Sequence, residues 1–277
     1  MKLKAWAIPL DMPVLKMIAD HTYVTSSDGD EWGCWGRSSG GRKICEKEAS
    51  KKITTCIAGD NGKAGVLVYG VNGVCHQTAN RLLRDTRATV SSAKGYAASW
   101  ALFGPYGKVS PGGIKDPLWI IRETKCGIKP WSIDPLWISE TDTTDPYFEG
   151  LATVYSQIYD GLEKGTISLD QATLQLQMGE LSALVGSRLK TDLGADKINA
   201  LAQYRNELAK EYEMSMLTSS GNEALIAKNA NTVLNNFLAK AATTLTPEEY
   251  EAIFDCKPGV EVIVVDPEIA ANNVEIK

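Results

Sequence analysis

Residues 65–83 constrain the fold more than any other part of the chain, because their pattern changes from that of a strand to that of a helix at a cysteine. Residues 66–68 form a short apolar run, typical of a buried strand, and glycines interrupt it soon afterwards. From Cys75 onward the apolar residues recur at helical spacing. The sequence therefore predicts a strand, a glycine turn, and a helix that begins at Cys75.

A thiol in the first turn of a helix is a candidate nucleophile. The positive end of the helix dipole and the unpaired amide groups there favour thiolate over thiol. The same amide groups can stabilise a developing oxyanion. The alternative is that Cys75 is a small buried residue that fills the junction between strand and helix.

Composition limits the choice of a general base, since the chain has only two histidines. His76 follows Cys75 directly, and neighbours on a helix point about 100° apart, so His76 is poorly placed to take the thiol proton. His21 lies in residues 17–25, whose β-branched and aromatic content predicts a strand before a turn. Such a histidine is often structural, but together with Cys75 it is the candidate general base.

A histidine on a strand before a hairpin, followed by a glycine turn and a cysteine that opens a helix, resembles the circularly permuted branch of the papain-like, NlpC-type cysteine enzymes. Lecithin:retinol acyltransferase-like proteins belong to that branch. The resemblance covers residues 1–104 and rests on the order His21, then Cys75. It implies an α+β fold in which a small antiparallel sheet packs on the cysteine-bearing helix. It also implies thiolate attack on a carbonyl carbon, an acyl-enzyme, and hydrolysis or transfer.

The family orients its histidine with a third polar residue, on the strand after the histidine strand. Here that strand is expected over residues 31–37, which contain no Asn, Gln or His, so the chain departs from the family pattern. Asp20 neighbours His21 and is expected on the opposite strand face. Glu31 is the nearest carboxylate and is the candidate third catalytic residue, with a solvated turn residue as the alternative.

Two polar residues just before Cys75 are candidate substrate contacts. Asn72 and Tyr69 could orient a substrate or stabilise an oxyanion. The alternatives are a turn asparagine and a strand aromatic.

Two tryptophans are further candidate substrate contacts. The motif Asp-Pro-Leu-Trp-Ile occurs twice and contains Trp119 and Trp137. These side chains either pack on the core or, with Trp131, line a substrate groove.

The composition divides the chain into four parts. Residues 1–104 are predicted to form the papain-like core, in which residues 53–57 are a strand. Residues 105–150, rich in Pro, Gly and Trp, connect this core to a helical lobe over residues 151–257, and residues 258–277 contain a last strand and a tail. Four helices are predicted in the lobe. The first begins at a capping box at Ser168, the second and third are indicated by apolar spacing over residues 198–212 and 225–238, and the fourth begins at Thr246-Pro247. The last strand is predicted over residues 262–265.

Charge and composition exclude several classes of partner. The net charge of -5 provides no basic surface for nucleic acid, and no apolar run is long enough to span a bilayer. Prolines interrupt the opening segment too early for a signal peptide, so a cytoplasmic protein with six reduced cysteines is expected. Cys34, Cys45 and Cys56 are evenly spaced but contain no metal-binding C-x-x-C pair, and neither a metal nor a cofactor is expected.

Two function classes follow. The first is a thiol hydrolase or acyl/amide transferase that acts on a small amide, peptide or ester, with Cys75 as nucleophile and His21 as general base. The second is a non-catalytic binding or scaffold protein on the same fold, in which the helical lobe binds a partner. A second copy of the chain is one such partner.

Overall fold

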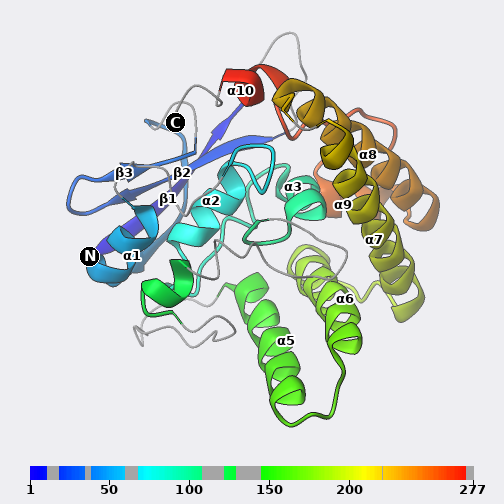
Figure 1. The fold of residues 1–277 in the computed structure, drawn as a ribbon, viewed down its shortest axis with the longest axis horizontal. Coiled ribbons are helices and arrows are strands. Elements are labelled where there is room, and N and C mark those ends of the chain that lie inside the picture. The colour runs from blue at the N-terminus through cyan, green and yellow to red at the C-terminus, as the bar shows by residue number, and fades with distance from the viewer. Residues whose placement is uncertain are drawn as a thin grey trace.

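A computed structural model of the protein describes residues 1–10, 19–34, 39–59, 68–107, 122–128, 145–219 and 221–272. In these residues the chain forms a four-stranded antiparallel sheet and a set of helices, as Figure 1 shows. The predicted α+β class with a small antiparallel sheet is therefore confirmed.

The sheet has the strand order β3-β2-β1-β4. β1 (Lys2–Pro9) lies at its centre and pairs with β2 (Asp20–Ser26) on one side and β4 (Arg42–Glu48) on the other, while the short β3 (Glu31–Trp32) pairs with β2. Leu3, Ala5 and Ala7 alternate along β1 and are buried. β1 was not predicted from the sequence, although its alternation is what an antiparallel strand with one buried face requires.

The prediction of a strand over residues 53–57 is wrong, because these residues lie in the helix α1 (Lys51–Ala58). The side chain of Ser50 caps this helix by accepting a hydrogen bond from the amide of Ile53, 3.4 Å away. Ile53 and Ile57, four residues apart, both enter the core. Helical spacing and a capping residue outweigh the strand preference of the β-branched side chains here.

The helix predicted to begin at Cys75 is confirmed as α2 (Cys75–Leu82). It packs against β2, and Figure 1 shows it between the sheet and α3 (Tyr96–Phe103). Most of the strand predicted before it, over residues 66–68, lies outside the described residues. Val68 is exposed and begins a tight turn instead.

A helical region follows, and the four helices predicted within it are confirmed. Two of them begin with a capping box: Ser168 and Gln171 at one, and Thr246 and Glu249 at the other. The first continues past Gly186, where its end was predicted, and an additional helix precedes it. The helices are α5 (Pro146–Glu163), α6 (Leu169–Arg188), α7 (Ala195–Thr218), α8 (Glu223–Thr244) and α9 (Pro247–Phe254).

The prediction of a strand over residues 262–265 is wrong. This segment is extended but pairs with amide side chains of α8 rather than with a strand. Asn231 Oδ1 accepts from the amides of Val264 and Val265 at 3.0 and 3.1 Å, and Asn235 Oδ1 accepts from that of Val262 at 2.9 Å. Two asparagine side chains thus take the hydrogen bonds that a neighbouring strand would otherwise take. A short helix, α10 (Pro267–Asn272), ends the described part of the chain.

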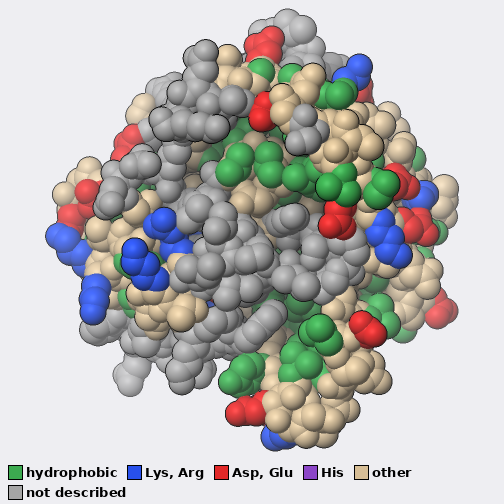
Figure 2. Space-filling model, in the orientation of Figure 1, with side chains coloured by type: hydrophobic (Ala, Val, Ile, Leu, Met, Phe, Trp, Pro, Cys, Tyr) green, Lys and Arg blue, Asp and Glu red, His purple; other side chains and the backbone are tan. Residues whose placement is uncertain are grey.

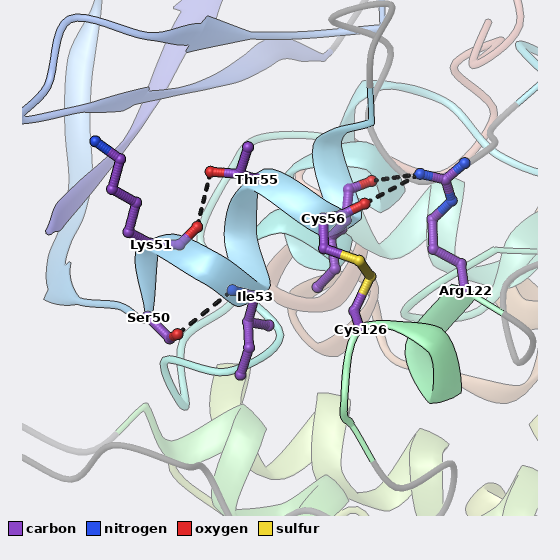
Figure 3. The surroundings of a disulfide bond; sticks show 8 residues. Ser50, Lys51, Ile53, Thr55, Cys56, Arg122 and Cys126 are labelled. Atoms are coloured by element: carbon purple, nitrogen blue, oxygen red, sulfur yellow. Dashed lines mark hydrogen bonds between the residues drawn. A yellow bond between two sulfur atoms is a disulfide. The ribbon is translucent and has the colours of Figure 1, made fainter.

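The expectation of six reduced cysteines is also wrong, because Cys56 at the end of α1 forms a disulfide with Cys126 (Figure 3). Their Cα atoms lie 5.6 Å apart, within the range a disulfide bridges. Arg122 Nη1 donates to the carbonyl oxygens of Cys56 and Ile57 at 3.1 and 3.4 Å. The two segments meet only in the fold, so the sequence did not reveal this pairing.

One hydrophobic core continues from the sheet through α3 into the helical region. Where they meet, Arg205 of α7 lies with its guanidinium 3.9 Å from the ring centre of Trp100 on α3 and forms an ion pair with Glu180 of α6 at 3.2 Å. None of the described helices combines the length and hydropathy needed to cross a bilayer.

Candidate functional site

Cys75 is the first residue of α2, and the side chain of Gln77 fixes the start of this helix. The amide of Val74 donates to Gln77 Oε1 at 3.1 Å, and Gln77 Nε2 donates to the carbonyl oxygen of Gly104 at 2.9 Å. Amide groups in the first turn of a helix have no acceptor within the helix. The thiol therefore lies beside free donors and the positive end of the helix dipole.

The turn before α2 depends on Gly70 and Asn72. Asn72 Oδ1 accepts from the amide of Val68 at 2.7 Å and closes the turn. Gly70 has a φ of +73°, and a Cβ atom there would lie 2.4 Å from Cγ1 of Val265. Only glycine fits both constraints without strain.

Aromatic hydroxyl groups attach this turn to distant parts of the chain. Tyr212 on α7 lies with its hydroxyl 2.5 Å from the carbonyl oxygen of Gly70 and 3.2 Å from that of Val71. The Tyr69 hydroxyl accepts from the amide of Asp266 at 3.1 Å. Asn72 and Tyr69 thus make structural bonds, and their role as substrate contacts stays a prediction.

The structure brings Cys75 and His21 together at the start of β2. The Sγ atom of Cys75 lies 3.9 Å from the carbonyl oxygen of Asp20, and its side chain hydrogen-bonds to the side chain of His21. The exposed fractions are only 9% for Cys75 and 7% for His21. A thiol in hydrogen-bond contact with an imidazole is the arrangement that thiol catalysis uses.

A second cysteine contacts the first. The side chain of Cys34, just after β3, hydrogen-bonds to Cys75 and to Thr78, one turn further along α2. From the sequence, Cys34 was expected to be a reduced thiol and was weighed as a metal ligand, but it was not assigned to the site. The alternation of side chains along β3 could have revealed it, since Cys34 follows the buried Trp32 by two residues.

These contacts shift the pKa values of the two thiols in opposite directions. The hydrogen bond from Cys34 lowers the pKa of Cys75 well below its ordinary value, and the charge of His76 and the hydrogen bond and charge of His21 lower it further, although burial opposes them. The hydrogen bond with Cys75 and burial raise the pKa of Cys34 well above its ordinary value. Of the two thiols, Cys75 therefore ionises more readily, and Cys34 holds its proton more tightly.

Both ring nitrogens of His76 have partners other than the Cys75 thiol, so His76 is not the base in this arrangement. Its Nε2 lies 3.0 Å from the carbonyl oxygen of Asp20, and its Nδ1 lies 2.8 Å from the hydroxyl of Ser99 on α3. Because a carbonyl oxygen only accepts hydrogen bonds, Nε2 carries a proton. His76 thus connects α2, β2 and α3, and its charge favours the thiolate.

Of the remaining predicted residues, only Glu31 is described by the structure, and it is not brought to the thiol. Glu31 is exposed and pairs with Thr25, four residues along β2 from His21. Four strand residues span about 13 Å, so Glu31 does not reach the imidazole from this position. Trp119, Trp131 and Trp137 lie outside the described residues.

Among the described residues, no group of three or more His, Cys, Asp or Glu side chains is arranged to hold a metal ion. Comparisons with protein-family models, with curated proteins and with solved structures find no match to this chain. The chemistry of the site must therefore be argued from its own residues.

Proposed function

We propose that the chain is a cysteine-dependent hydrolase or acyl/amide transferase of the permuted papain-like, NlpC type, acting on a small amide, peptide or ester. The observation that carries the proposal is the position of the Cys75 thiol, at the start of a helix and in hydrogen-bond contact with His21, which lowers its pKa. A thiolate beside an imidazole is the activated nucleophile that acyl transfer requires.

The reaction follows from these positions. His21 takes the proton of the Cys75 thiol, the thiolate attacks the carbonyl carbon of the substrate, and the first-turn amides of α2 stabilise the oxyanion. His21 gives a proton to the leaving amine or alcohol, and a thioester on Cys75 remains. His21 then takes a proton from water or from an acceptor amine or alcohol, which attacks the thioester and releases Cys75.

A non-catalytic binding protein is the alternative, and two observations favour it. Cys75 and His21 are nearly buried. Large apolar side chains are also exposed near the junction of α7 and α8, with exposed fractions of 61% for Met214, 71% for Leu217 and 40% for Leu225. Figure 2 shows hydrophobic side chains gathered in a band across the upper half of the face it presents, and the right-hand part of this band overlaps the place of α7 in Figure 1. Such exposed apolar area is typical of binding surfaces, including one for a second copy of the chain.

The test is the pH dependence of iodoacetamide alkylation, followed by mass spectrometry, in the wild type and in His21→Gln. We expect Cys75 to react much faster than Cys45 near neutral pH, and His21→Gln to slow Cys75 while leaving Cys45 unchanged. A screen of ester and amide substrates with Cys75→Ala as the inactive control then detects turnover. If Cys75 reacts no faster than Cys45, the catalytic proposal fails and the binding alternative stands.

A further inference from the structure

Strand register places Cys34 on the sheet face that α2 covers. β3 pairs with β2 through Trp32 opposite Val24, and both side chains are buried in the core. A Cβ atom on Gly33 would lie 3.5 Å from Cβ of Tyr23, so the two strands still run side by side one residue further on. Because side chains alternate, Cys34 points to the same face as Trp32.

The partner on that face is the first turn of α2. Cys34 hydrogen-bonds to Cys75 and to Thr78, which lie three residues apart and therefore on one side of the helix. The two sulfur atoms thus meet across the interface between sheet and helix. Cys34 is only partly buried whereas Cys75 is nearly buried, so a small oxidant such as hydrogen peroxide has to enter past Cys34.

We propose that Cys34 and Cys75 form a reversible disulfide on exposure to a hydroperoxide, and that this bond switches the nucleophile off. The bond is a property of the cysteine pair alone, whereas its effect on activity rests on the proposed function.

The chemistry requires two steps and one oxidant. The Cys75 thiolate attacks the terminal oxygen of the hydroperoxide, an S–O bond forms, the O–O bond breaks, and the alkoxide or hydroxide takes up a proton. The Cys34 thiol then loses its proton and attacks the sulfur of the sulfenic acid; the S–S bond forms, the S–O bond breaks, and hydroxide leaves as water. Two electrons pass from the two thiols to the peroxide.

The other cysteines define the controls. Cys56 and Cys126 are already paired, so their bond is an internal reference. Cys45 lies on β4 opposite Ala5, and like Cys34 it is a partly buried thiol. Cys45→Ser is therefore the matched control for Cys34→Ser.

The experiment treats the full-length protein with hydrogen peroxide, blocks remaining thiols, and maps tryptic peptides without reduction. Trypsin separates residues 17–37, which contain Cys34, from residues 64–81, which contain Cys75. We expect these two peptides to become joined, with the loss of two hydrogen atoms in mass, in the wild type and in Cys45→Ser. Mild dithiothreitol should separate them and restore alkylation of Cys75.

Cys34→Ser should give no joined peptide, and its Cys75 should proceed to sulfinic acid, which dithiothreitol does not reverse. The inference is overturned if peroxide leaves the wild-type peptides separate, whether Cys75 is then unmodified or over-oxidised. That result is measured on the wild-type protein and so does not depend on whether any variant folds. Failure of the proposed function is a different result: the joined peptide forms, but the untreated protein turns over no ester or amide.

Discussion

His76 Nε2 lies 3.0 Å from the carbonyl oxygen of Asp20, so the residue after the proposed nucleophile holds the residue before the proposed general base. The neighbours on either side of this bond are Cys75 and His21. One hydrogen bond thus sets the distance between the helix that carries the thiol and the strand that carries the imidazole.

His76→Ala should therefore disturb both stability and reactivity. It leaves the buried Asp20 carbonyl and Ser99 hydroxyl without this partner, which costs about 1–3 kcal/mol in the free energy of unfolding. Alkylation of Cys75 should slow, because the strand end that carries His21 is no longer held to α2. Chemical denaturation and alkylation rates measure the two effects. His76→Gln, whose amide can donate to the same carbonyl, should lose less stability, and equal losses for both variants would contradict this role.

Tyr212→Phe removes the hydroxyl that binds the Gly70 and Val71 carbonyl oxygens and keeps the ring that packs against Phe103. We expect a loss of about 1 kcal/mol in the free energy of unfolding, and faster amide exchange in the turn before α2. Hydrogen exchange followed by mass spectrometry measures this. Tyr159→Phe, at an exposed tyrosine on α5, is the control and should change neither quantity. Unchanged exchange in Tyr212→Phe would show that the turn does not depend on α7.

The buried carboxyl group of Asp85 should make the free energy of unfolding depend on pH. Burial raises the pKa of this carboxyl to about 6, although it accepts a hydrogen bond from the Ser50 amide at 3.0 Å. A group with a raised pKa stabilises the fold fully below its ordinary pKa and loses that contribution as the pH rises through the folded value. The wild type should thus lose stability between about pH 4 and pH 7 through this group.

Asp85→Asn does not ionise, so its free energy of unfolding relative to the wild type should rise by roughly 1–3 kcal/mol over that pH range. Urea unfolding at several pH values measures the difference. Glu163→Gln, at the exposed end of α5, is the control. A difference that does not vary with pH would contradict the assignment.

Two glycines should respond oppositely to alanine. Gly70→Ala places a methyl group 2.4 Å from Cγ1 of Val265 at a positive φ, and we expect a loss of more than about 1–2 kcal/mol. Gly186 is exposed within α6, and a Cβ atom there meets nothing within 4 Å. Gly186→Ala should therefore stabilise the protein by about 0.5–1 kcal/mol. Thermal unfolding of both variants tests the pair, and a stable Gly70→Ala would show that the turn can rearrange.

Local signals in the sequence predicted the helices well. The capping boxes at Ser168 and Thr246 and the change of period at Cys75 each depend on residues a few positions apart, and all three helix starts are confirmed. The strand prediction over residues 53–57 failed because residue type was given more weight than helical spacing and the Ser50 cap. Ile53 and Ile57 prefer strands by type, but their common burial places them on a helix.

The site was predictable in part for the same reason. His21 was chosen by elimination between two histidines, and the fold places it at the thiol. Cys34 depends on the register of β3 against β2, and the bond of His76 to Asp20 on the packing of α2. The alternation from Trp32 indicates the face on which Cys34 lies, but its contact with Cys75, like the bond of His76 to Asp20, joins residues far apart in the sequence and could not be predicted from local pattern.

The bond between Cys56 and Cys126 has a mechanical consequence. The two residues are 70 positions apart, and the segment they enclose contains α2, α3 and Cys75. If the chain were pulled from its two ends, tension would pass through the sulfur atoms and bypass this segment. The enclosed residues would add no length to the stretched chain until a reductant opened the bond. The helix that carries Cys75 therefore lies in the part of the protein that is shielded from a pulling force.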